Sequence, residues 1–342
     1  MQQVVTFPSG QVKYLFNSSI DKLWDIYRPN EVVFITDKHI AAAYPAFFKE
    51  HKSIVLAAGE GSKTLETVGH IVEKLLTLQA TRDCVLIGFG GGVITDITGF
   101  VASVYMRGVR CAFIPTTVLG MADAAIGGKN GVNNGMHKNI TGTIRQPECL
   151  LYDISLLQTL PHDEWSNGFA EVIKYACLFD AELFKELISN NINFYKTNAA
   201  AMQQVITRCA DWKNRIVAND EHEKGMRKLL NFGHTAAHAI ENLYEMPHGQ
   251  AVAIGMVIAA TLSEQITGLT PGITLMLKDL LQQYDLPVNY KIDTAQAMHL
   301  LKMDKKRHND TIDFILLEDI GQAVIKPLSL DIIENAIARC TQ

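Results

Sequence analysis

Short apolar runs rich in β-branched residues alternate with helical patterns through the first half of the chain, and this alternation restricts the fold more than any other feature. The runs are EVVFITD (31–37), SIVLAAGEG (53–61), CVLIGFGGG (84–92) and VRCAFIPTT (109–117). Helical patterns follow the second and third runs, at 64–80 and 93–106. Strands that alternate with helices indicate an α/β fold with a doubly wound parallel sheet.

The second half of the chain has a different pattern, mostly helical. Helical spacing is found at 161–179, 199–219, 251–268 and 274–285, and residues 311–325 are typical of a β-hairpin. We therefore predict two domains. Residues 1–155 would form a nucleotide-binding α/β domain, and residues 156–342 a mainly α-helical domain that binds metal and substrate.

Composition excludes several classes of protein. The 342 residues are 48% hydrophobic with a net charge of -5, so the chain has material for a core and no overall polyanion-binding character. Six scattered cysteines form no CxxC pair, which argues against a disulfide framework and favours a reducing compartment. The N-terminus does not resemble a signal peptide, and the longest apolar run (251–260) is too short to span a bilayer. We expect a cytoplasmic protein without nucleic-acid or membrane partners.

A glycine-rich turn, GFGGGVITD (88–96), follows the third strand and opens a helix. Glycines allow close approach of a phosphate, and a helix N-terminus offers it free N–H groups. The GxGxxG dinucleotide pattern is incomplete, because Val93 occupies the place of its last glycine. The alternative is a tight strand-to-helix turn without a ligand. The polar PTT (115–117) and GGK (127–129) segments nearby favour a nucleotide in the first half.

The segment 231–249 is rich in histidine. Asn231, His234 and His238 are spaced i, i+3 and i+7, so they share a face if one helix carries them, with Asn231 at the N-cap and His234 in the first turn. The zinc-protease pattern HExxH is absent, because Thr235 follows the first histidine. His248 lies beyond a break and could fold back toward the helix. Each histidine by itself could equally be a satisfied core residue or a helix cap.

A carboxylate and several cations accompany these histidines. Glu171 and Lys174, three residues apart on an otherwise apolar helix, would be costly to bury unless paired or ligating. Two histidines with a glutamate would resemble a catalytic zinc site. Basic residues recur beside the motifs and predict an anionic substrate with phosphate and carboxylate groups: Arg107, Lys129, Lys138, Lys174, Lys213, Arg227, Lys305 and Lys306.

The order and spacing of these motifs resemble the 3-dehydroquinate synthase family, within the sugar phosphate cyclases. The resemblance runs from about residue 30 to about residue 325 and rests on GGGVITDITGF, MRG, PTT, IGGKNGVN, KN, LPHDEWSNGFAEVIKYA, LLNFGHTAAHAIE, HGQAVAIGM and DKK. It implies a lyase of the shikimate pathway that depends on NAD and on a divalent metal, which is zinc or alternatively cobalt. The implied reaction converts 3-deoxy-D-arabino-heptulosonate 7-phosphate to 3-dehydroquinate and phosphate. Its steps are transient oxidation, phosphate elimination, re-reduction and intramolecular aldol closure.

The resemblance also implies roles for individual residues. The metal ligands would be Glu171, His234 and His248. NAD would contact Asp37, Glu60, Lys63, Gly91, Gly92, Val93, Asp96, Thr116, Thr117, Asp123, Lys129, Lys138 and Thr159. The substrate would contact Arg107, Lys129, Lys138, Asn139, Lys174, Lys213, Arg227, Asn231, His238 and one of Lys305 and Lys306, of which we favour Lys305. Among these, we predict direct participation in the reaction for His238, Lys174, Lys129, Asn231 and Arg227.

The chain departs from the family pattern at three places. His137 stands before KN, Asn130 follows GGK, and Arg145 lies in GTIRQP where the family usually has a histidine. Other readings remain: another sugar phosphate cyclase, a metal-dependent NAD polyol dehydrogenase, or a binding module without activity. Family members are commonly homodimers, so we expect a homodimer here.

Overall fold

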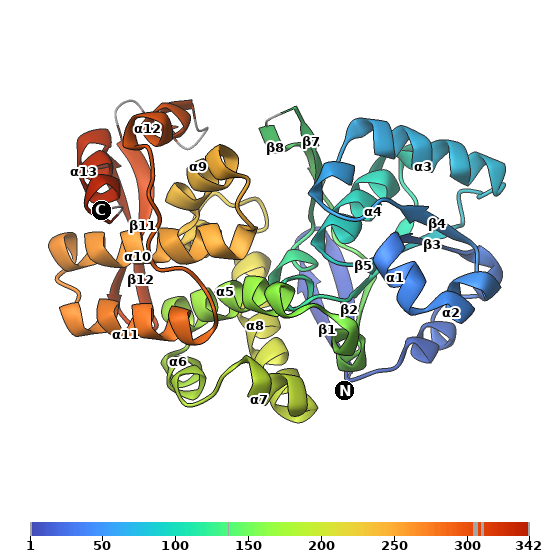
Figure 1. Cartoon of the computed structure of the whole chain (residues 1–342). Helices are drawn as coiled ribbons and strands as arrows, with labels where there is room; N and C mark the ends of the chain where they lie inside the picture. The colour runs from blue at the N-terminus through green and yellow to red at the C-terminus, as the bar shows by residue number, and fades with distance from the viewer. Residues whose placement is uncertain (1, 136, 304–306, 309–310, 341–342) are drawn as a thin grey trace. The chain divides into compact units, whose positions relative to one another are not determined.

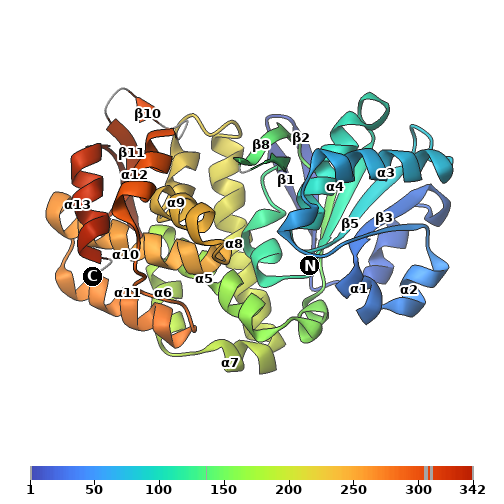
Figure 2. The ribbon, with the colours of Figure 1, turned by 45° about the horizontal axis from the view of Figure 1, so that its top comes forward.

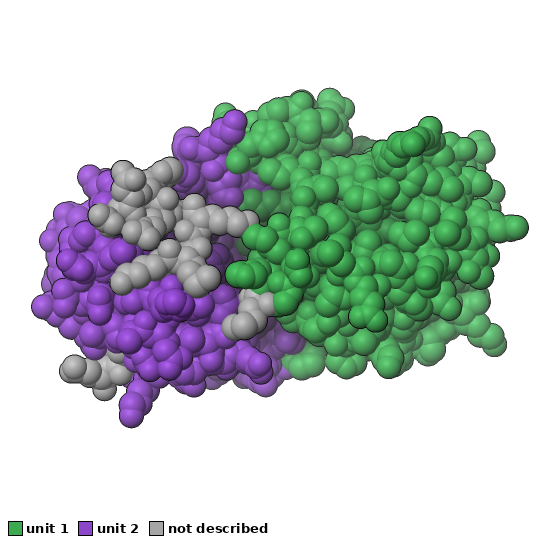
Figure 3. Space-filling model, turned by 90° about the horizontal axis from the view of Figure 1, so that it is seen from above, with its two compact units in different colours: residues 1–161, 199–222 green, residues 162–198, 223–342 purple. Residues whose placement is uncertain are grey.

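The computed structural model describes residues 2–135, 137–303, 307–308 and 311–340, and the chain divides into two compact units (Figures 1 and 3). Unit 1 comprises residues 1–161 and 199–222, and unit 2 comprises residues 162–198 and 223–342. Our predicted division at residue 155 differs from this one chiefly in residues 199–222, which pack with the first half. The division into domains at residue 155 remains a proposal.

Unit 1 is built on a seven-stranded sheet with the order β1-β2-β9-β6-β5-β3-β4. The strands are β1 (Gln2–Phe7), β2 (Gly10–Phe16), β3 (Val32–Asp37), β4 (Ser53–Leu56), β5 (Val85–Gly90), β6 (Arg110–Pro115) and β9 (Cys149–Tyr152). All neighbouring strands are parallel except β1 and β2, which form an antiparallel hairpin. Every residue of β5 is buried, as expected for a strand covered on both faces. The predicted parallel sheet is confirmed, and the N-terminal hairpin is an addition that we did not predict.

Helices cover both faces of this sheet. Figures 1 and 2 show α3 (Leu65–Thr77) and α4 (Gly92–Val104) over one face and α1 (Lys38–Ala43) and α2 (Pro45–Glu50) over the other. Thr64 caps α3, and this helix buries Val68, Ile71 and Leu75, which share one face at i, i+3 and i+7. The doubly wound arrangement is thus confirmed. The long helix α8 (Ala199–Asn219) packs on β1 in the same unit.

A two-stranded antiparallel hairpin of β7 (Lys129–Asn134) and β8 (His137–Ile144) also belongs to unit 1. It packs on α4, and our sequence analysis treated this stretch only as polar strand ends.

Unit 2 is mainly helical, as predicted. Its helices are α5 (His162–Phe179), α6 (Ala181–Ile188), α7 (Ile192–Thr197), α9 (His234–Tyr244), α10 (His248–Ile266), α11 (Pro271–Gln283), α12 (Thr294–Met303) and α13 (Leu330–Cys340). A small antiparallel sheet joins β10 (Arg307–His308), β11 (Thr311–Asp319) and β12 (Gln322–Ser329), and β11–β12 confirm the predicted hairpin.

Helix α10 lies at the centre of unit 2, against α5, α9, α11 and β11. It is apolar nearly all round, which is typical of a buried helix. Within the described residues, it is also the one helix long and apolar enough to cross a membrane, yet most of its apolar window is buried inside the protein. Core helices of soluble proteins share these properties.

Candidate metal centre and cofactor-binding turn

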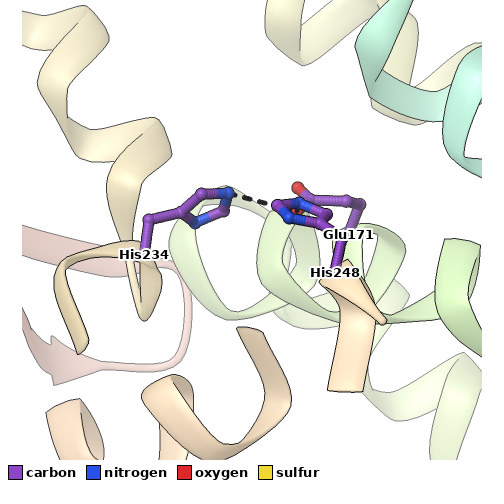
Figure 4. A group of neighbouring side chains, drawn as sticks. All are labelled: Glu171, His234 and His248. Atoms are coloured by element: carbon purple, nitrogen blue, oxygen red, sulfur yellow. Dashed lines mark hydrogen bonds and ion pairs between the residues drawn. The ribbon is translucent and has the colours of Figure 1, made fainter. Parts of the chain in front are cut away.

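Three side chains converge in unit 2 on one small volume (Figure 4). One oxygen of Glu171, Oε1, lies 3.3 Å from Nε2 of His234 and 3.2 Å from Nε2 of His248. One potential ligand atom from each of these residues lies within 4.8 Å of the other two. Glu171 comes from the middle of α5, whereas the histidines open α9 and α10. Sequence positions up to 77 residues apart therefore meet at one point.

Two close backbone approaches hold the histidines in place. Gly233, with a positive φ of 78°, precedes α9, and a Cβ added at Gly255 of α10 would lie 2.0 Å from the Gly233 carbonyl oxygen. At the start of α10, the backbone N–H of Gly249 donates to Asn167 of α5, and a Cβ at Gly249 would meet the Asn167 carbonyl oxygen at 2.2 Å. Only glycine permits these separations, so the three helices are tied together beside the ligands.

The helix containing His234 begins later than we predicted. Asn231 ends the preceding 3₁₀ turn (Met226–Asn231), and the residue before α9 is the left-handed Gly233 rather than Asn231. The predicted N-cap role of Asn231 is therefore wrong, because the chain reverses at Gly233 before the helix starts. His234 does lie in the first turn of α9, as expected.

Burial and neighbouring charges set the protonation of the three side chains. Burial opposes ionisation of Glu171, but the Lys174 ammonium and the two histidines outweigh it and hold the pKa of Glu171 well below its usual range. Burial lowers the pKa of His234, which favours its neutral form. Burial would also lower the pKa of His248, yet hydrogen bonds to Glu171 and Glu241 raise it to about 10. At neutral pH, His248 is therefore the protonated member of the cluster, and a divalent metal would have to displace its Nε2 proton.

The donor set fits a tetrahedral divalent metal with an open position. Ligand bonds of about 2.0–2.1 Å place neighbouring ligand atoms roughly 3.3–3.4 Å apart. The contacts of 3.3 and 3.2 Å from Glu171 to the histidines already match that spacing. Two imidazoles and a carboxylate, with no thiolate, are a ligand set that suits zinc or cobalt.

Among the remaining predicted residues of unit 2, Lys174 and His238 contact this cluster. Lys174 forms an ion pair with Glu171, and both side chains are buried, at 1% and 0% exposure. The ring of His238 meets that of His234 edge to face at 5.7 Å. Arg227 is also buried, at 2% exposure. Asn231 donates from its amide to Glu223 at 2.6 Å and to the Lys228 carbonyl at 3.2 Å.

In unit 1, the glycine-rich turn connects β5 to α4 as the sequence indicated. Gly91 is the N-cap of α4. As a glycine it has no side chain that could accept a hydrogen bond from the first N–H groups of the helix. A Cβ at Gly91 would lie 3.0 Å from Thr117, and one at Gly92 would lie 3.2 Å from Ala124. The turn therefore packs closely against the segment that follows β6. This geometry can accept a phosphate.

Several residues predicted to contact NAD form one polar network in unit 1. Lys63 bonds to Asp96 at 2.6 Å and to Asn139 at 2.5 Å. Asn133 connects the same group to Glu60 by a hydrogen bond of 2.7 Å and accepts from the Asn139 backbone at 2.8 Å. Burial raises the pKa of Asp96, although Lys63 opposes that shift.

The other predicted residues of unit 1 have varied positions. Lys213 of α8 pairs with Asp123 at 2.5 Å, which joins one residue assigned to substrate and one assigned to NAD. Asp37 caps α1, Thr116 is buried, Thr117 accepts from Gly120, and Val93 lies in the first turn of α4. Thr159, Lys129, Lys138 and Arg107 are exposed, and Arg107 has a left-handed φ of 64°. Lys305 and Lys306 lie outside the described residues.

Comparisons with known proteins agree with this arrangement. Residues 53–167 match the sequence model of the 3-dehydroquinate synthase N-terminal domain, and residues 168–307 match that of the C-terminal domain. This chain belongs to the 3-dehydroquinate synthase family. It is 40% identical to the 3-dehydroquinate synthase of Nitratiruptor sp., over 90% of this chain and 89% of that one. It is 38% identical to the enzyme of Saccharolobus solfataricus, over 94% of each.

Solved structures show the same fold. The 2-epi-5-epi-valiolone synthase of Streptomyces hygroscopicus, with NAD+ and Zn2+ bound, is 29% identical and matches with a TM-score of 0.84 over 91% of each chain. A 2-deoxy-scyllo-inosose synthase complexed with carbaglucose-6-phosphate, NAD+ and Co2+ is 23% identical and matches with a TM-score of 0.87 over 99% of this chain and 100% of the other.

Two departures from the family pattern are connected in space. The Asn130 amide donates to the carbonyls of Gly128 and Arg145 at 2.8 and 2.9 Å. The Arg145 guanidinium donates to the carbonyls of Ala102 and Val109 at 2.6 and 2.7 Å. Asn130 and Arg145 therefore act together to hold β7 and β8 on α4. The third departure, His137, is an exposed residue of β8.

Two contacts beside the site were missing from our sequence analysis. Glu241 lies 3.5 Å from Nδ1 of His248, and Glu223 bonds to Asn231. A signal existed for Glu241, because positions 234, 238 and 241 share one helical face. Glu223 lies in an irregular segment with a φ of 57°, where no periodicity indicates which way its side chain points.

Proposed function

We propose that this protein is a 3-dehydroquinate synthase, a lyase that converts 3-deoxy-D-arabino-heptulosonate 7-phosphate to 3-dehydroquinate and phosphate in the shikimate pathway. Relatives of that name at about 40% identity over most of the chain support this function. The observation that carries it at the level of residues is the Glu171–His234–His248 cluster, formed by three separate helices.

We propose that unit 1 binds NAD at the β5–α4 turn. The N–H groups at the start of α4 would hold the pyrophosphate, and the network of Glu60, Lys63 and Asp96 would hold the remaining polar groups. When bound, NAD would reversibly accept hydride, and a divalent metal at Glu171, His234 and His248 would polarise a substrate oxygen.

The residues of the chain would then fix the substrate and move protons. Lys174 holds the pKa of Glu171 low and is paired with it, so its ammonium group also lies beside the cluster. Arg227 and Lys213 would hold anionic groups, for which a buried guanidinium is well suited because of its planar fork. His238, beside His234, would transfer a proton to or from the substrate. Preorganised cations of this kind stabilise developing charge without reorganisation during the reaction.

A second candidate function follows from the fold. The structural neighbours include synthases of an inosose and of a valiolone, so another sugar phosphate cyclase activity is the main alternative. Identity of 37–44% to the dehydroquinate synthases, against 29% to the valiolone synthase, favours the first function. A polyol dehydrogenase would release NADH as a product, and this difference separates it from both cyclases.

Phosphate release from the heptulosonate phosphate is the deciding measurement. Purified protein with zinc or cobalt and a catalytic amount of NAD should release phosphate, form 3-dehydroquinate and leave no net NADH. A chelator should stop the release. If metal-loaded protein releases no phosphate from this substrate but does so from a sugar phosphate that lacks the carboxylate, the alternative cyclase activity would replace our proposal.

We also propose a cytoplasmic homodimer. Five cysteines, Cys84, Cys111, Cys149, Cys177 and Cys209, are buried and form no disulfide with one another, which suits a reducing compartment. Light scattering during size-exclusion chromatography would give the mass in solution for comparison with the 37.9 kDa of one chain.

A further inference from the structure

We infer that Glu241 is a positioning residue for the metal centre, which sets the tautomer of His248 and supplies a charge that the cluster otherwise lacks. This inference rests on the proposed metal site and deepens it. The observation behind it is a contact of 3.5 Å between Glu241 Oε2 and Nδ1 of His248, on the side of the ring opposite to Glu171.

The local fold brings Glu241 to this ring. Glu241 lies in the last turn of α9, and His248 is the first residue of α10. Glu245 ends α9 in a left-handed conformation with a φ of 49°, and the chain then reverses through a short connection. Two residues seven positions apart thus face one another, and the side chain of Glu241 is only 12% exposed.

Helix stability alone does not account for a carboxylate at this position. The C-terminal turn of a helix carries partial negative charge and favours cations, so a carboxylate there is unfavourable for the helix. Its burial beside an imidazole offsets that cost, because an N–H donor faces its oxygen. The position of this carboxylate is therefore explained better by its contact with His248 than by any stabilisation of α9.

The two histidine ligands are oriented by different acceptors. Nδ1 of His234 faces the backbone carbonyl of Phe232 at 3.1 Å, and a carbonyl can only accept, so that nitrogen bears the proton. Nδ1 of His248 faces the carboxylate of Glu241 instead. In both arrangements a proton on Nδ1 would leave Nε2, the nitrogen that faces Glu171, able to give its lone pair to a bound metal. A carboxylate behind a ligand histidine also makes the imidazole more basic, which a neutral carbonyl does less well.

The charges of the cluster give a second reason to assign Glu241 a role in metal binding. Lys174 neutralises most of the charge of Glu171, because the two form a buried ion pair. A dication among these groups would therefore have almost no net compensating negative charge unless Glu241 is counted. Loss of Glu241 is expected to weaken metal binding in addition to loosening the His248 ring.

The test is metal affinity, measured on the full-length protein by competition with a chelator for Co2+ and Zn2+. We expect Glu241→Ala to raise the dissociation constant about 10–100-fold, the usual effect of removing an outer-shell partner. Glu241→Gln, whose amide oxygen can still accept from Nδ1, should lose less affinity and keep the tautomer. Glu245→Gln is the matched control, because Glu245 is exposed at the end of the same helix, and it should bind as the wild type does.

A second readout separates positioning from folding. The d–d absorption of bound Co2+ should shift in Glu241→Ala while the far-ultraviolet circular dichroism stays unchanged, and Glu241→Gln carries the test if the alanine variant does not fold. Wild-type metal affinity in both Glu241 variants would overturn the inference and leave the proposed function intact. Absence of metal binding by the wild-type protein would instead overturn the proposed metal site, and the role of Glu241 with it.

Discussion

The contact between Gly255 and Gly233 leads to a prediction that connects the packing of two helices to the metal centre. Gly255 lies in the first half of α10, and Gly233 precedes His234 at the start of α9. In Gly255→Ala the new Cβ would lie 2.0 Å from the Gly233 carbonyl oxygen and 2.9 Å from its carbonyl carbon. These are backbone atoms, so no side-chain rotation relieves the clash.

The required movement is large compared with the tolerance of a metal site. Ordinary contact begins at 3.4 Å, so the two helices must separate by 3.4 minus 2.0, or 1.4 Å. Metal–ligand distances are held within about 0.2 Å, and the two histidine ligands lie on the two helices that separate. We expect a metal affinity at least tenfold lower, since removal of outer-shell support alone costs 10–100-fold. Overpacking should also destabilise the fold by about 1–3 kcal/mol.

The control is Gly69→Ala on α3, because a Cβ at Gly69 meets nothing within 4 Å. This substitution removes a flexible residue from a helix and should be neutral or stabilising by up to about 1 kcal/mol. Thermal unfolding and chelator competition on both variants make the comparison. If Gly255→Ala binds metal as tightly as the wild type and unfolds at the same temperature, the close approach of α9 and α10 does not set the ligand geometry, and the reasoning fails.

Three further predictions concern unit 1. Burial opposes ionisation of Glu221, but hydrogen bonds lower its pKa below 4.5, so its stabilising contribution is present above about pH 4.5 and lost as the pH falls through its folded pKa; Glu221→Gln should be less stable than the wild type near pH 7 in urea unfolding, with a difference that narrows toward about pH 3. Asn130→Thr removes both amide hydrogen bonds of a buried side chain, one of them to Arg145, and should cost about 1–3 kcal/mol in the same assay; an unchanged midpoint would refute the coupling of these departures. Lys63→Met removes the cation from half-buried Asp96 and should weaken NAD binding roughly tenfold or more in titration calorimetry, with metal affinity as the control that must not change.

The sequence predicted those parts of the fold that depend on local pattern. Alternating apolar runs and helical periodicity were enough for the parallel sheet of unit 1, because buried strands and amphipathic helices each impose their own period. The β7–β8 hairpin was missed because its residues are polar and glycine-rich, and its position depends on contacts with α4, such as Asn130 against Gly99. Helix α8 was placed in the second half, because nothing in its own sequence says that it packs on β1.

The candidate metal ligands were predictable in part. Two histidines at helical spacing and a glutamate on an apolar helix signal a costly burial that needs a partner. Periodicity alone could not choose between His238 and His248, because His238 shares the helical face of His234 whereas His248 lies beyond a break. The choice came from family resemblance, and the structure brings Glu171, His234 and His248 together. The chain reverses at Glu245 and so brings His248 back to the cluster, and no periodic pattern in the sequence predicts this reversal.

The close-packed glycines explain why residue types and their spacing do not by themselves specify this site. A cluster formed by three helices requires distances accurate to a few tenths of an ångström, and here the distances depend on where two backbones touch. Gly249, Gly255 and Gly69 are the same residue type. Gly249 and Gly255 lie where backbones touch beside the candidate ligands, whereas a Cβ at Gly69 would meet nothing within 4 Å. The candidate ligand residues determine which metal the site could bind. The glycines at the helix contacts determine whether the three side chains come close enough to bind it. Substitutions at Gly249 and Gly255 should therefore affect metal binding as strongly as changes in the outer shell of the ligands themselves.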